Sequence, residues 1–299
     1  SIRQPASYNG VYGIKPTFGT VSRYGVVAMA SSTDTMGCFT NNADDMNLIM
    51  SIMSGKDAKD STTLDNFWQE KLEDGKQAEK KKIGLISDFL GDGVDPEVAK
   101  NVRDYAKKLE KAGYAVEEVS MPILKYGLAI YYVVQPAEVA SNLSRYDGIR
   151  YGHRAAEFDD LDGLYANTRN EGFMPENKRR IMIGNFVLSS GFFDAYYLKA
   201  QKARTLLINA YNEVFEKYDA LLCPVAPAPA FKIGEKVNDP LAMYMEDVMS
   251  VPPSMAGLPA ISVPAGKTKA GLPVGAQLIG QRQSDQMLLS IAKSVEEQA

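Results

Sequence analysis

The chain has 299 residues and a formal net charge of −4 at pH 7, with 33 basic and 37 acidic side chains. This mildly acidic balance excludes a protein whose own surface supplies most of its phosphate contacts to a nucleic acid. Two cysteines and one histidine are too few for a disulfide framework or for a zinc site of the usual spacing. No apolar run reaches the length of a bilayer span, so we expect no contact with a membrane.

The first predicted element is a helix that Asn41 or Asn42 caps and Gly55 ends. Apolar side chains recur along it at helical spacing, which predicts one buried face. Residues 56–82 are polar, and we interpret them as an excursion from the main body of the chain.

A strand–helix–strand unit is predicted next. A strand at residues 82–86 precedes Asp95, which caps a helix with Pro96 in its first turn. Gly113 ends this helix before a second strand at residues 115–119. Because such a crossover is right-handed and joins parallel strands, the sheet is expected to be at least partly parallel.

The region from residue 124 to 217 is mainly helical in pattern, and a long amphipathic helix is predicted over residues 193–218. An apolar strand at 219–225 follows it and runs into a proline-rich segment at 224–229. That segment can form neither a helix nor a central strand, because proline lacks the backbone donor.

Two strands and a helix complete the predicted order. The strands, residues 260–263 and 274–279, flank a polar turn at 267–271, and Ser284 caps the final helix. The fold class is therefore α/β, with a large mixed β-sheet covered by helices on its faces. No clear boundary divides the pattern, so we predict a single domain over residues 1–299.

The first 28 residues carry a dense motif, SIRQPASYNGVYGIKPTFGTVSRYGVVA. It resembles the core motif of the amidase signature family, in which this serine attacks an amide carbonyl. The resemblance implies the amidase signature fold, here the C-terminal portion of the domain. It also places the family's activating lysine, and its second serine in a cis peptide, before the motif. We therefore expect Ser1 to be one member of a three-residue catalytic set, and the isolated chain to be inactive.

Further blocks resemble one branch of that family, the glutaminase subunits of the glutamyl-tRNA(Gln) amidotransferases. They lie in order along the chain and include SRYG at 22–25, DAKDS at 57–61, SNLSRYDG at 141–148, FDAYY at 193–197 and LPVGAQLIG at 272–280.

A serine nucleophile needs a proton acceptor and an oxyanion hole. Lys15 is the nearest lysine in sequence, but its Lys-Pro-Thr context matches a structural part of the motif. His153, the only histidine, is interpreted as structural. Arg3 is expected to form an ion pair with an acid before the motif rather than to bind substrate.

A glutaminase must recognise the α-carboxylate and the α-ammonium group of its substrate. A guanidinium suits the first and a carboxylate the second. The resemblance assigns these roles to Arg180 and Asp247, and it places Tyr131 in the same pocket. Arg179 and Tyr132 are the adjacent alternatives.

The implied function is hydrolysis of the glutamine amide through an acyl-enzyme. The ammonia serves amidation of glutamyl-tRNA(Gln), with aspartyl-tRNA(Asn) left open as a second acceptor, in a cytoplasmic complex with subunits B and C. The resemblance implies no cofactor in this chain, ATP and Mg²⁺ in the partner, and tRNA bound through the partner. In a eukaryote the complex would be mitochondrial or plastid. The alternatives are a stand-alone amidase of the same family, an enzyme that uses the amine of Ser1 as base, and a catalytically silent assembly domain.

Overall fold

The computed structural model describes residues 1–69, 72 and 81–297. Part of the predicted excursion, residues 70–71 and 73–80, lies outside the described residues. The described chain forms two compact units that are interleaved in sequence. Unit 1 comprises residues 1–24, 35–128 and 205–299, and unit 2 comprises residues 25–34 and 129–204. The expectation of a single domain with an excursion at 56–82 stays a prediction.

The described strands of unit 1 form one seven-stranded mixed sheet in the order β2-β1-β6-β7-β5-β3-β4. β3 pairs in parallel with both β4 and β5, and the other pairs are antiparallel. The strands are β1 (Tyr12–Lys15), β2 (Cys38–Thr40), β3 (Lys82–Ile86), β4 (Ala115–Val119), β5 (Ala220–Pro224), β6 (Ala260–Lys267) and β7 (Pro273–Gly280). The predicted α/β class and mixed sheet are confirmed.

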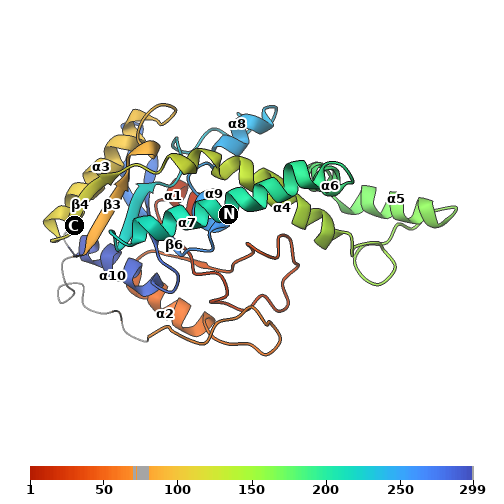
Figure 1. Cartoon of the computed structure of the whole chain (residues 1–299), viewed down its shortest axis with the longest axis horizontal. Coiled ribbons are helices and arrows are strands. Elements are labelled where there is room, and N and C mark those ends of the chain that lie inside the picture. Colours follow the sequence, from red (N-terminus) through yellow and green to blue (C-terminus); the bar gives the residue numbers. More distant parts are fainter. Residues whose placement is uncertain (70–71, 73–80, 298–299) are drawn as a thin grey trace. The chain divides into compact units, whose positions relative to one another are not determined.

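Helices pack on both faces of this sheet (Figure 1). α3 (Pro96–Lys111) and α10 (Asp285–Glu296) cover one face, with α2 (Ala43–Met53) against α10. Alternate strand residues such as Ile261 and Leu278 point into this layer, whereas their neighbours Ser262 and Gln277 point to the opposite face. α1 (Arg3–Asn9) packs on that opposite face, against β6 and β7.

Three further short helices and two long ones complete unit 1. The short ones are the 3₁₀ helix η1 (Ser87–Phe89), α8 (Pro240–Met245) and α9 (Val251–Met255), and a 3₁₀ turn η2 (Pro122–Tyr126) precedes α4. The long helices α4 (Gly127–Leu143) and α7 (Lys199–Phe215) each continue from one unit into the other. Unit 2 adds α5 (Leu161–Gly172), α6 (Pro175–Leu188) and the π-helix η3 (Phe193–Leu198).

Several local predictions are confirmed at the level of single residues. Asn42, and not Asn41, caps α2, because its side chain accepts a hydrogen bond from the backbone N–H of Asp45. Asp95 accepts from the N–H of Glu97 in the same way at the start of α3. Capping satisfies backbone donors that have no partner within the helix, so such residues mark helix starts reliably.

Other local predictions are wrong in detail. The helix predicted over 193–218 is divided, because its first part is the π-helix η3 and only the second part is the α-helix α7. Ring stacking of Phe193 on Tyr197, with centroids 5.2 Å apart, accompanies the wider turn. Ser284 occupies the cap position of α10, but its hydroxyl donates backwards to the carbonyl of Gln281 and leaves the helix uncapped.

Candidate functional site

The element that carries Ser1 is α1, which follows it directly. Gly10 ends this helix in the left-handed conformation, with φ of 67°, which costs glycine little. α1 lies very close to the sheet, because a Cβ atom on Gly13 would come within 2.6 Å of the Ala6 Cβ atom. Gly275 permits the same approach beside Ser7, whose hydroxyl accepts a hydrogen bond from its N–H.

Arg3 fixes this helix to the sheet from its buried position. Its guanidinium donates to the Gln277 side chain on β7, to the Ser250 carbonyl at 2.6 Å and to the Ser254 hydroxyl at 2.7 Å. Burial lowers the pKa of Arg3 to about 10. These acceptors in the described structure are neutral, so the expected ion pair with an acid before the motif stays a prediction.

Asp247 lies in the turn between α8 and α9, where its carbonyl accepts from the N–H groups of Ser250 and Val251. Its charge reaches the region around α1. Burial and Arg3 lower the pKa of the Ser1 amine, and Asp247 acts on it in the opposite direction. Asp247 likewise opposes the effect of burial on the pKa of Arg3. The structure therefore brings two predicted site residues, Ser1 and Asp247, into one electrostatic neighbourhood of unit 1.

The other two predicted residues, Arg180 and Tyr131, contact each other in unit 2. Arg180 on α6 donates through Nη1 to the Tyr131 hydroxyl on α4 at 3.2 Å. Its side chain is 16% exposed, whereas that of Arg179 is 46% exposed. The guanidinium also lies over the ring of Tyr132, 5.7 Å from the ring centre. Arg180 is thus embedded against α4, and it is not the solvated charge that its position beside Arg179 would suggest.

Two residues that sequence reasoning missed orient this guanidinium. Gln135, which is buried, accepts from Nη1 of Arg180 at 3.1 Å, and Glu176 accepts from Nε at 2.9 Å. Burial lowers the pKa of Arg180, but Tyr131 and Glu176 raise it by more, so the net shift is upward. The only signal for them in the sequence is spacing, because Tyr131 and Gln135, like Glu176 and Arg180, are four residues apart on a helix face.

The close crossing of α4 and α6 places these partners. A Cβ atom on Gly184 would overlap the Pro136 carbonyl oxygen and come within 2.6 Å of the Ala140 Cβ atom. Gly184 lies one turn beyond Arg180 on α6, and Pro136 follows Gln135 on α4. The absence of a side chain at Gly184 therefore sets the distance over which Arg180 reaches α4.

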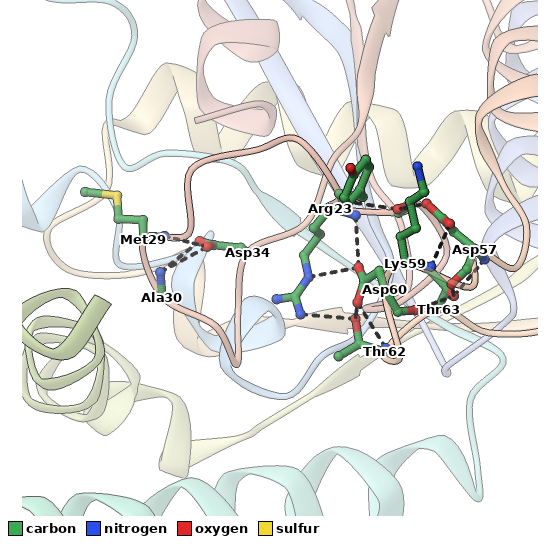
Figure 2. Close-up of polar contacts among 11 residues, drawn as sticks. Arg23, Met29, Ala30, Asp34, Asp57, Lys59, Asp60, Thr62 and Thr63 are labelled. Carbon is green, nitrogen blue, oxygen red and sulfur yellow. Dashed lines mark hydrogen bonds and ion pairs between the residues drawn. The ribbon is translucent and has the colours of Figure 1, made fainter. Parts of the chain in front are cut away.

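Two blocks of the opening resemblance, SRYG and DAKDS, meet in unit 1 (Figure 2). The backbone N–H of Arg23 donates to Asp60 at 2.9 Å, and its guanidinium donates to Asp60 and to the Thr62 hydroxyl at 3.1 Å. Ser22 donates to Asp57 at 2.7 Å. Hydrogen bonds from Thr62 and Arg23 hold the pKa of Asp60 below its usual range. These carboxylates accept from the loop's own donors, which indicates a structural loop.

Within unit 2, Asp34 closes a turn by accepting from the N–H groups of Met29 and Ala30 (Figure 2). The same segment is tied to α4 and α7. The Ser32 N–H donates to Glu138 at 2.9 Å, and Arg204 donates to the Ser32 hydroxyl at 2.8 Å. This segment is thereby ordered by side chains on its own unit.

Lys15 and His153 have the structural surroundings expected of them. Lys15 is buried on β1 and donates to the Pro16 carbonyl at 2.7 Å, and burial lowers its pKa to about 7. His153 lies in unit 2 with its Nε2 atom 2.6 Å from a Glu171 carboxylate oxygen. Their exclusion from catalysis stays a prediction.

Within residues 1–69, 72 and 81–297, no three His, Cys, Asp or Glu side chains are grouped so that they could hold a metal ion. The helices in these ranges are too short or too polar to cross a bilayer. Both cysteines are free; Cys223 is buried and Cys38 half-buried.

Comparison with known proteins decides the family. The family model described as Amidase matches residues 1–289. The chain belongs to the amidase family. It is 47% identical over 304 aligned residues to the glutamyl-tRNA(Gln) amidotransferase A-subunit of Picosynechococcus and 49% identical over 294 residues to that of Persephonella marina. The crystal structure of the same protein from Thermotoga maritima superposes with a TM-score of 0.79 at 40% identity.

These amidase relatives are longer than the chain. The alignments cover 99% and 98% of the chain but 62% and 60% of the two curated relatives, and the Thermotoga maritima structure is covered to 60%. The matched part begins at Ser1 in the family model and includes Tyr131, Arg180 and Asp247.

The crossing of α4 and α6 yields a test of sign. Alanine is favoured over glycine inside a helix by about 1 kcal/mol, so propensity alone would make Gly184→Ala stabilising. Because the new Cβ would overlap the Pro136 carbonyl, we expect Gly184→Ala instead to lower the free energy of unfolding by about 1–3 kcal/mol. Denaturant unfolding of the 299-residue chain measures this.

Gly172→Ala is the matched control in unit 2, because its Cβ would meet His153 at an ordinary 3.7 Å. We expect that variant to change stability by less than about 0.5 kcal/mol. A Gly184→Ala protein as stable as the wild type, or more stable, would contradict the close crossing.

Proposed function

We propose that the protein containing this chain hydrolyses the side-chain amide of glutamine. The ammonia is passed to a partner that amidates glutamyl-tRNA(Gln), and in some settings aspartyl-tRNA(Asn). The observation that carries the proposal is the identity of 47–49%, over nearly the whole chain, to relatives named as the A-subunit of glutamyl-tRNA(Gln) amidotransferase. The surroundings of Ser1, Asp247 and Arg180 support it.

Ser1 is the proposed nucleophile. Its Oγ atom bonds to the amide carbon, and the C–N bond breaks as the leaving nitrogen takes a proton, which gives ammonia and a γ-glutamyl ester. Water then hydrolyses the ester to glutamate and restores the serine. The amidase resemblance assigns the proton relay to a lysine and a second serine that precede the motif.

Arg180 and Asp247 are the proposed selectors of glutamine. A guanidinium binds a carboxylate through two parallel hydrogen bonds, and its orientation decides the geometry. Gln135, Tyr131 and Glu176 engage the Nη1 and Nε atoms of Arg180, and the structure shows no hydrogen bond from Nη2 within the described residues. Arg180 would hold the α-carboxylate, Tyr131 would line its site, and Asp247 would accept from the α-ammonium group.

The partners are proposed from the same relationship. Subunits B and C would complete the amidotransferase, with ATP, Mg²⁺ and tRNA bound through the partner that activates the glutamyl group. The mildly acidic balance of this chain agrees with tRNA binding elsewhere in the complex. We place the complex in the cytoplasm.

The first test removes the nucleophile. In the complete protein assembled with its partners, Ser1→Ala is expected to abolish glutamine-dependent amidation and to leave the reaction with free ammonia unchanged. The two reactions separate because the partner's site receives only ammonia. Ser144→Ala, an exposed serine on unit 2, is the control and keeps both. Equal loss of both reactions in a folded, assembled Ser1→Ala complex would make Ser1 structural.

The second test separates a glutaminase from a general amidase. Arg180→Ala is expected to raise the KM for glutamine with a loss of about 2–5 kcal/mol, because it leaves the substrate carboxylate without its partner. The KM for 4-aminobutanamide, which lacks that carboxylate, is expected to change little. Arg179→Ala is the control on the same helix. An equal rise for both amides in Arg180→Ala would favour the stand-alone amidase.

A further inference from the structure

A buried acidic side chain that the proposed chemistry does not use lies directly before Asp247. Glu246 is 4% exposed, and its carboxylate accepts from the Tyr8 hydroxyl at 2.8 Å and forms an ion pair with Lys236. Its carbonyl also accepts from the Gln4 side chain at 3.0 Å. A buried carboxylate is retained only where such partners offset its desolvation.

These contacts form a closed ring, which we call the Glu246 latch, made of Tyr8, Phe231, Lys236 and Glu246. The Tyr8 and Phe231 rings meet edge to face with centroids 6.2 Å apart. The Lys236 ammonium group lies over the Phe231 ring, 4.7 Å from its centre. Each member therefore holds two others, and the ring joins α1 to the segment before α8 and to the residue preceding Asp247.

The latch also has a fixed donor direction. Burial, with a further contribution from the bond to Glu246, raises the pKa of Tyr8, so its phenol stays protonated and donates. α1, which bears Tyr8, begins two residues after Ser1. A second set of bonds, from Arg3 to Ser250 and Ser254, secures the chain just after Asp247. Asp247 is thus flanked on both sides by attachments to the helix that follows Ser1.

We propose that Glu246 and Tyr8 are positioning residues that set where Asp247 stands relative to Ser1, and so determine selectivity for an amide substrate with an α-ammonium group. This inference rests on the proposed role of Asp247. Loosening the latch lets the Asp247 carboxylate move while the nucleophile stays in place. Recognition of the ammonium group is then lost before the chemistry is.

The test compares glutamine with glutaramate, which keeps the amide and the carboxylate but lacks the α-amine. In the assembled protein, Glu246→Gln is expected to raise the KM for glutamine by about tenfold and to leave that for glutaramate within about twofold. Tyr8→Phe keeps the ring contact with Phe231 and removes only the donor. We expect it to produce the same selective change, smaller in size.

The control is Glu235→Gln, an exposed acid beside Lys236, which is expected to change neither KM. In an Asp247→Asn background, Glu246→Gln is expected to add nothing, because the group that it positions no longer accepts the ammonium strongly. Thermal unfolding of each variant identifies any loss of folded protein, and Tyr8→Phe keeps the test informative if Glu246→Gln fails to fold.

The outcomes separate the two claims. If Asp247→Asn fails to distinguish glutamine from glutaramate, the proposed role of Asp247 is wrong. If Asp247→Asn distinguishes them but Tyr8→Phe and Glu246→Gln affect both amides equally, the latch is only structural and this inference is overturned.

Discussion

The desolvated guanidinium of Arg3 is the interaction on which the surroundings of Ser1 depend. A buried cation is costly unless its donors are satisfied, and Arg3 is satisfied by a β7 side chain and by groups of the segment at 250–254. Gln277 extends the attachment, since its amide donates to the Met249 carbonyl at 3.0 Å. The helix after the nucleophile, the sheet and the segment that bears Asp247 are consequently one hydrogen-bonded body.

Unit 2 restrains its own cation by a similar principle with different means. Arg180 is held by one neutral amide, one phenol and one carboxylate, and the close approach of α6 to α4 at Gly184 brings them within reach. A restrained guanidinium loses less entropy on binding a carboxylate than a mobile one does. In both units, therefore, the residues around a proposed site residue contribute chiefly by limiting its freedom.

Sequence reasoning succeeded where the signal is local and failed where it is not. Asn42 and Asp95 were identifiable as caps because each acts within three residues, and the hydrophobic spacing sufficed for the sheet and most helices. β1 and β2 were missed, since one lies inside the motif and the other has three residues. The resemblance named Arg180 and Asp247, but no local pattern reveals that Glu246 meets Tyr8 from 238 residues away.

The central claim is that Ser1 forms a covalent bond with the carbon of a glutamine side-chain amide. The most direct measurement uses a glutamine analogue that carries a reactive electrophile in place of that amide, followed by peptide mass mapping of the complete protein. The account predicts a stoichiometric adduct on the peptide that contains Ser1, competed by glutamine and absent from Ser1→Ala. An adduct that persists in Ser1→Ala, or that maps to another residue such as Cys223, would contradict it.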